Sequence, residues 1–102
     1  MLIDLHMHEA TFSTDSFLKL EEMVAIAQRL GLQGICITDH DSIGLRDAAA
    51  AYSRKTSFPI LVGVEFYSLQ GDIVAFGIDT VPEKRLSAQD FIDYVKGQCG
   101  IC

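Results

Sequence analysis

The chain has 102 residues, of which 49% are hydrophobic and 22% charged, and its formal net charge is −6 at pH 7. A chain of this length forms one domain at most and can bury a single hydrophobic core. The acidic charge argues against non-specific binding to nucleic acid or to anionic membranes, because both favour a basic protein surface. It leaves open an enzyme that acts on phosphates, since bound cations would reverse the local field.

The sequence shows no signal for secretion or for membrane insertion. No apolar run approaches the ~20 residues that span a bilayer, and the first ten residues lack the basic segment of a signal peptide. Three cysteines, an odd number, fit a reducing compartment better than a disulfide framework. We therefore expect a cytoplasmic protein with no membrane partner.

The first third of the chain predicts a strand, a helix and a second strand. Residues 2–6 form a short apolar run. Residues 19–30 carry apolar side chains at helical spacing, and Gly31 stands where a helix C-cap is expected. Residues 34–38, "GICIT", form a continuous apolar strand of the kind that parallel sheets bury on both faces.

The remaining residues predict a second helix, a hairpin and a third helix. The helix covers 44–55, a buried strand covers 59–68, and "QGD" at 70–72 turns the chain into a further strand over 73–78. Ser87 is the expected N-cap of the third helix, and the last residues, "CGIC", resemble the start of one more strand. This order predicts an α/β fold with mostly parallel strands.

All three histidines of the chain fall at the ends of predicted strands. His6 and His8 close the first strand, His40 follows the second, and Glu65 lies late in the third. In parallel α/β folds the carboxyl ends of the strands share one rim, where functional residues gather. We therefore expect these four side chains to lie close together.

Residues two apart on a strand point to the same side, so His6 and His8 are able to face one ion while Met7 faces the packing. Carboxylates are available from Asp4, Asp15, Asp39, Asp41 and Glu65. Imidazole and carboxylate ligands suit zinc and neighbouring first-row metals, which activate water for hydrolysis of a phosphoester. An isolated His-x-His or Asp-His-Asp is weak evidence. The joint placement on successive strands carries the hypothesis.

The segments "DLHMH", "KLEEM", "GICITDHDSIGL" and "ILVGVEFY" resemble, in order and spacing, the N-terminal part of the PHP (polymerase and histidinol phosphatase) superfamily domain. The resemblance implies the N-terminal half of a distorted seven-stranded, TIM-like (β/α) barrel. It also implies two or three divalent metal ions (zinc, manganese or iron) at the C-terminal rim. The implied activity is a metal-dependent phosphoesterase acting on a small phosphorylated substrate or nucleotide.

The resemblance assigns roles residue by residue. His6 and His8 match two ligands of one metal, and Asp15 and His40 match ligands of another. Glu65 matches a carboxylate that bridges two ions. The loop between His8 and Asp15 is slightly longer than the family pattern.

The aspartates near these positions keep structural interpretations beside functional ones. Asp4 is either a partner of the ligand histidines outside the metal shell or a buried structural residue. Asp39 either orients the His40 ring or caps the next turn, and Asp41 is expected to cap that turn. Glu9 is expected to face solvent. Cys36 is expected to be a small core residue.

The family's remaining ligands come from a second half that this sequence does not supply, so we expect residues 1–102 to be a truncated PHP domain. Two hypotheses compete. In the first, the parent protein is a phosphoesterase, nucleic acid is a less favoured substrate, and this chain alone has little or no activity. In the second, the chain is a non-catalytic metal-binding or interaction module. Open sheet edges also predict self-association.

Overall fold

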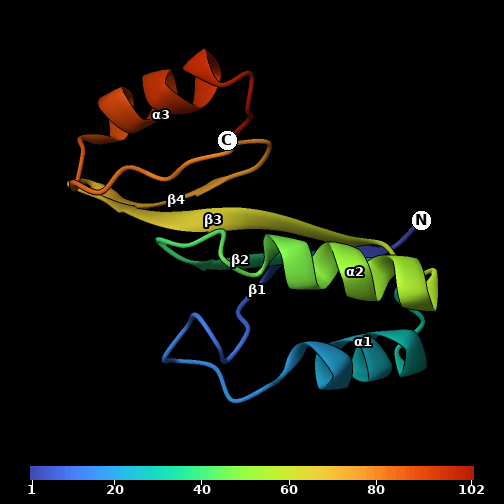
Figure 1. Ribbon diagram of the computed structural model, residues 1–102. Coiled ribbons are helices and arrows are strands. Elements are labelled where there is room, and N and C mark those ends of the chain that lie inside the picture. Colours follow the sequence, from blue (N-terminus) through green and yellow to red (C-terminus); the bar gives the residue numbers. More distant parts are fainter.

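The computed structural model describes residues 1–102 as a four-stranded sheet with three helices. The sheet order is β1-β2-β3-β4, in which β1, β2 and β3 are parallel and β4 is antiparallel to β3 (Figure 1). The predicted α/β fold with mostly parallel strands is confirmed. In chain order the elements are β1 (Ile3–Met7), α1 (Leu20–Arg29), β2 (Gly34–His40), α2 (Arg46–Thr56), β3 (Ile60–Ser68), β4 (Gly71–Ala75) and α3 (Ala88–Gly97).

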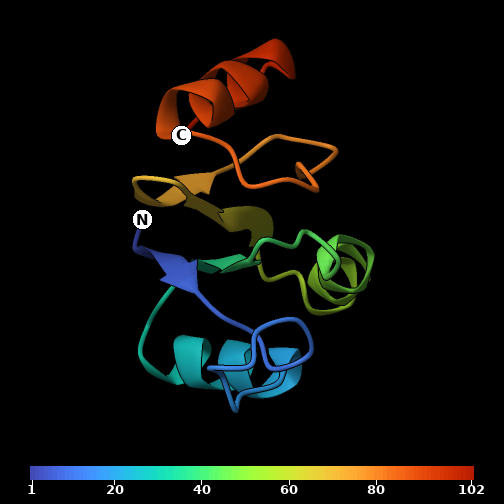
Figure 2. The ribbon, with the colours of Figure 1, turned by 90° about the vertical axis from the view of Figure 1, so that its left-hand side faces the viewer.

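The helices lie on the outer side of a curved sheet. Figure 2 shows α1, α2 and α3 arranged around the convex side, while the concave side carries no helix. Side chains alternate along β3, so Ile60 and Val62 pack toward α1 and α2 whereas Leu61 and Glu65 share the opposite face. The sheet therefore has one covered face and one open face.

Two hydrophobic clusters hold the helices to the sheet. In the first, α1 and α2 pack on β2 and the start of β3. In the second, α3 packs on the end of β3 and on β4, and the rings of Phe66 and Phe91 stack with centroids 4.1 Å apart. The first cluster is built from Leu20, Met23, Val24, Ala27, Ile35, Ile37, Leu45, Ala49, Phe58 and Ile60, and the second from Val64, Phe66, Ala75, Ile78, Phe91 and Val95.

The predicted helix end signals are confirmed for α1 and α3. Gly31 follows the last turn of α1 with a φ of 80°, a left-handed conformation that glycine adopts at little cost. The Ser87 hydroxyl accepts a hydrogen bond of 3.1 Å from the Asp90 backbone N–H at the start of α3. These local signals act within a few residues, which is why they can be read from sequence.

The strand ends differ from the prediction. β1 extends to Met7 and β2 to His40, so hydrogen bonding between strands continues up to the histidines. The expected strand over 73–78 is Gly71–Ala75, and Phe76 then forms an isolated antiparallel bridge with Ile101. The chain end thus returns to the edge of β4.

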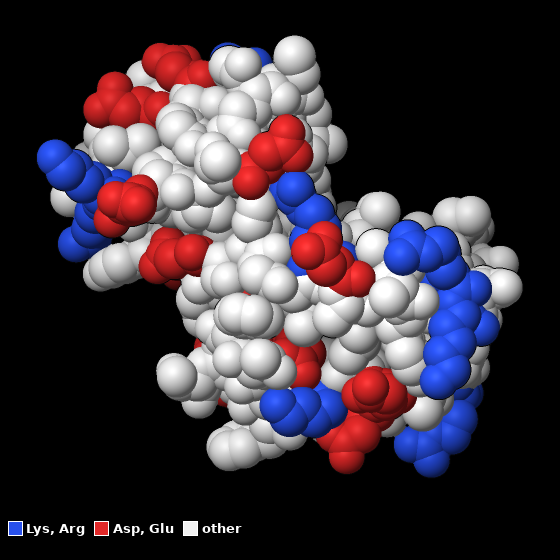
Figure 3. Space-filling view, in the orientation of Figure 1, with Lys and Arg blue, Asp and Glu red and all other residues white.

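Charged side chains are distributed unevenly between the two ends of the sheet. Figure 3 shows a group of Lys and Arg at the right, where β1, β2 and β3 begin in Figure 1, and a second group at the left. Arg29, Arg54 and Lys55 lie in the last turns of α1 and α2, where cations favour the helix dipole. None of the three helices has the length and apolar character needed to cross a membrane.

Candidate metal centre

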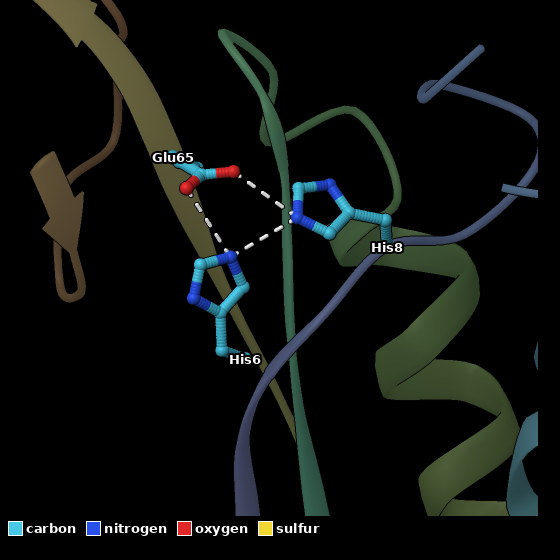
Figure 4. A group of neighbouring side chains, drawn as sticks. All are labelled: His6, His8 and Glu65. Atoms are coloured by element: carbon cyan, nitrogen blue, oxygen red, sulfur yellow. Dashed lines mark hydrogen bonds and ion pairs between the residues drawn. The ribbon is translucent and has the colours of Figure 1, made fainter. Parts of the chain in front are cut away.

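His6 near the end of β1 and His8 just after it meet Glu65 of β3 (Figure 4), which lies beside His40, the last residue of β2. The two Nε2 atoms lie 3.1 Å apart. Glu65 Oε1 lies 3.3 Å from His6 Nε2, and Glu65 Oε2 lies 3.1 Å from His8 Nε2. We call His6, His8 and Glu65 the first donor group.

His8 also belongs to a second donor group, with Asp15 and His40. His40 Nε2 lies 2.9 Å from Asp15 Oδ2, and His8 Nδ1 lies 4.0 Å from Asp15 Oδ1. His40 Nδ1 lies 3.3 Å from Glu65 Oε2, which joins the two groups. The structure thus brings together all five residues predicted as metal ligands, including Asp15 on the loop that is slightly longer than the family pattern.

Strand register explains the convergence. In the parallel pair β2–β3, His40 is the partner of Glu65, and the Asp41 backbone N–H donates to the Glu65 carbonyl at 3.0 Å. β1 lies on the other side of β2 and runs parallel to it, so its end reaches the same rim. The predicted proximity of His6, His8, His40 and Glu65 is confirmed.

The donor atoms fit a metal ion in chemistry and in spacing. Zinc holds imidazole nitrogen and carboxylate oxygen at about 2.1 Å, and tetrahedral geometry then keeps the ligand atoms about 3.4 Å apart. The two imidazole nitrogens of the first donor group lie 3.1 Å apart, close to this spacing, and each lies 3.1 to 3.3 Å from one oxygen of the Glu65 carboxylate. The same nitrogen and oxygen donors also suit other first-row divalent ions, so the spacing does not select one metal.

The second donor group perturbs the titration of its members. A hydrogen bond to Asp15 raises the pKa of His40 above 6.5, against the opposing effect of partial burial. The hydrogen bond to His40 lowers the pKa of Asp15 below 3.8. Each group therefore stabilises the charged form of the other.

Comparison with known proteins agrees with this geometry. The PHP domain family matches residues 4–96. The chain belongs to the PHP domain family. Its structure is similar to the crystal structure of a Bifidobacterium adolescentis protein provisionally described as a metal-dependent phosphoesterase, with a TM-score of 0.66 and 32% sequence identity. This similarity covers 79% of the chain and 29% of the bacterial protein.

Two curated relatives also match this PHP chain. An uncharacterized protein of Methanocaldococcus jannaschii is 24% identical over 110 residues, which cover 99% of the chain and 64% of the relative. The "Probable histidinol-phosphatase" of Thermotoga maritima is 41% identical over 39 residues, 38% of the chain and 16% of the relative. The chain therefore spans less than two thirds of the length of each relative.

Asp39 supports the loop after β1 rather than the ring of His40. Its Oδ1 accepts hydrogen bonds from the Glu9 backbone N–H at 2.6 Å and from the Ser13 hydroxyl at 3.0 Å. Asp39 is 2% exposed, and its burial raises the pKa of the carboxyl group above 3.8. The structural interpretation of Asp39 is thus the one that the contacts favour.

Glu9 was expected to face solvent, and that expectation is wrong. The residue is 2% exposed, and its Oε2 accepts the Thr11 backbone N–H at 2.6 Å. The chain leaves the strand after Met7, so strand alternation no longer decides which way Glu9 points. Sequence analysis also missed Ser13, because only the folded loop brings its hydroxyl to the histidines.

Asp4 and Asp41 contact backbone groups near the site. Asp4 Oδ1 accepts the His6 backbone N–H at 3.0 Å and does not reach a histidine ring nitrogen through any hydrogen bond. Asp41 Oδ1 accepts the Tyr67 backbone N–H at 2.9 Å. Both aspartates thus shape the strand ends that carry the donors. Cys36 is buried, as expected.

Proposed function

We propose that the protein is a metal-dependent phosphoesterase and that this chain carries the first part of its metal site. The observation that supports the proposal is the convergence of three imidazoles and two carboxylates on one rim of the sheet. Acidic and imidazole groups gathered so closely favour cations. The family match and the phosphoesterase described among its structural neighbours support the same class of reaction.

The proposed ligands divide between two ions. His6, His8 and Glu65 would hold one ion, Asp15 and His40 would hold another, and Glu65 is the candidate bridge because its Oε2 lies near both His8 and His40. Such ions, which we propose are zinc, manganese or iron, would supply positive charge to phosphate oxygens and activate water. A third ion and further ligands would come from parts of the protein outside residues 1–102.

The exposure of the proposed ligand side chains indicates where a substrate would bind. His6 and His40 have half-exposed side chains, 47% and 40%, whereas Glu65 is 11% exposed. A substrate phosphate would approach from the solvent side of the two histidines. The buried Glu65 carboxylate would contact the imidazole rings from the side facing the protein. We propose a small phosphate ester or nucleotide as substrate. The net charge of −6 disfavours a nucleic-acid polymer.

The test measures metal content and hydrolysis on the same sample. Purified protein is analysed by inductively coupled plasma mass spectrometry, and hydrolysis of p-nitrophenyl phosphate is followed with added zinc, manganese or iron(II). Bound metal with metal-dependent hydrolysis by the full-length protein supports the proposal. Bound metal without hydrolysis of any phosphate ester would favour the non-catalytic module, and a protein without metal affinity would contradict both.

A further inference from the structure

The Ser13 hydroxyl lies at the meeting point of three polar groups beside the metal centre. Its Oγ lies 3.3 Å from His8 Nδ1, 3.0 Å from Asp39 Oδ1 and 3.2 Å from the His40 backbone nitrogen. Ser13 is 2% exposed, so water does not compete freely for these contacts. A hydroxyl has one hydrogen and two lone pairs, and three partners use all of them.

The direction of each hydrogen bond follows from the partners. The His40 backbone N–H can only donate to Ser13. Asp39 Oδ1 already accepts the Glu9 backbone N–H at 2.6 Å, so it is an acceptor and receives the Ser13 hydrogen as well. The remaining lone pair of Ser13 faces His8 Nδ1, which must therefore carry a hydrogen.

This assignment decides between the two uses of His8. The residue belongs to the first donor group through Nε2 and to the second through Nδ1, and it cannot serve both if Nδ1 keeps its hydrogen. We propose that Ser13 is a positioning residue that reserves His8 for the first donor group, with Nε2 as the ligand atom. The second ion would then draw on Asp15, His40 and Glu65.

The contacts on the two sides of the ring agree with this division. Ser13 Oγ is the only side-chain atom within hydrogen-bond distance of Nδ1, since Asp15 Oδ1 lies 4.0 Å away, whereas Nε2 lies 3.1 Å from both His6 Nε2 and Glu65 Oε2, the other candidate ligand atoms of the first donor group. Ligand histidines in metal sites commonly donate their other N–H to a fixed acceptor, which sets the ring orientation. The inference rests on the proposed metal centre.

The decisive measurement uses the unaltered protein. Protein labelled with ¹⁵N-histidine is loaded with ¹¹³Cd²⁺, and the three imidazoles are followed by NMR. We expect ¹¹³Cd coupling to Nε2 of His8 and an Nδ1–H resonance on the same ring. Coupling to Nδ1 would overturn the inference while leaving the metal centre intact. Absence of cadmium binding would overturn the metal centre itself, and this inference with it.

Three variants separate ring positioning from general loop stability. Ser13→Ala should weaken cadmium binding by about 10- to 100-fold, and His8 should no longer show ¹¹³Cd coupling at Nε2 alone. Ser13→Thr keeps the hydroxyl and should retain both the affinity and the Nε2 coupling of the unaltered protein. Ser16→Ala is the matched control, because the Ser16 hydroxyl donates to the His8 carbonyl at 2.6 Å and not to the ring. Unchanged affinity and an unchanged Nδ1–H in Ser13→Ala would contradict the proposal.

Discussion

The Asp15–His40 pair gives the rim a defined pH response before any metal binds. Because the pKa of His40 is raised, its contribution to stability is present below the ordinary value of 6.5 and is lost as pH rises through the raised pKa. Because the pKa of Asp15 is lowered, its contribution is present above 3.8 and is lost as pH falls through the lowered pKa. The pair is thus fully formed between about pH 3.8 and 6.5.

Replacing Asp15 with Asn should lower the pKa of His40 toward its ordinary value in the metal-free protein. The hydrogen bond that the His40 ring donates to the Asp15 carboxylate is the largest cause of the raised pKa, whereas Asp72 contributes a smaller Coulombic effect. NMR titration of the three histidines measures the change. Asp72→Asn is the control and should shift the His40 pKa less. Equal shifts in both variants would show that overall negative charge, not the hydrogen bond, raises this pKa.

Removing a proposed ligand should lower metal occupancy. His8→Ala and His40→Ala each delete one imidazole from the rim and should reduce the bound metal measured by mass spectrometry at a fixed metal concentration. Met7→Leu should leave occupancy nearly unchanged, because Met7 packs against the first hydrophobic cluster. Similar losses from all three changes, with reduced thermal stability, would indicate unfolding rather than ligand removal.

At the scale of elements, β3 is the strand that packs in both hydrophobic clusters. It pairs with β2 on one side and β4 on the other, and it carries Glu65 on the open face. A side chain at Gly63 would overlap the Ala75 carbonyl oxygen and the Phe76 ring. The close approach of β4 to β3 therefore requires glycine at this position.

Gly63→Ala should lower the free energy of unfolding by about 1–3 kcal/mol, the range for overpacking in a rigid environment. One of the two obstacles is the backbone carbonyl of Ala75, so a change in the Phe76 rotamer alone cannot relieve the overlap. Gly97→Ala is the matched control, since its added methyl meets no atom within 4 Å and alanine favours a helix. Urea denaturation compares the two. A Gly63→Ala protein as stable as Gly97→Ala would contradict the close packing of β3 and β4.

On the scale of the whole molecule, the concave face leaves apolar side chains exposed. Leu61 lies in an interior strand of the sheet and is nevertheless 56% exposed, because its face carries no helix. Leu5 in β1 and Leu69 after β3 are similarly exposed, at 63% and 57%. Apolar surface of this kind is usually covered by association or by further chain.

We predict that residues 1–102 by themselves self-associate at micromolar concentration. Light scattering coupled to size exclusion should give a mass above the 11.2 kDa of one chain. Leu61→Lys should shift the population toward the monomer without unfolding it, because the side chain is largely outside the core. A wild-type monomer at all concentrations would contradict the prediction.

Much of the fold was predictable because it depends on local signals. Apolar periodicity located α1, and Gly31 and Ser87 marked helix ends through contacts within a few residues. The ligand candidates were predictable because parallel strands place their carboxyl ends on one rim. The extension of β1 and β2 up to the histidines was missed, since pairing between strands depends on partners far along the chain.

The sequence by itself determined the α/β class, the family and the gathering of histidines with Glu65, because these follow from residue types at fixed spacing. Only the tertiary structure decided the burial of Glu9, the contacts of Asp39 and the position of Ser13 between two histidines. These features lie in, or are set by, the loop after β1, whose path no periodic pattern specifies. Long-range hydrogen bonds to β2 fix that path, and they exist only once the sheet has formed.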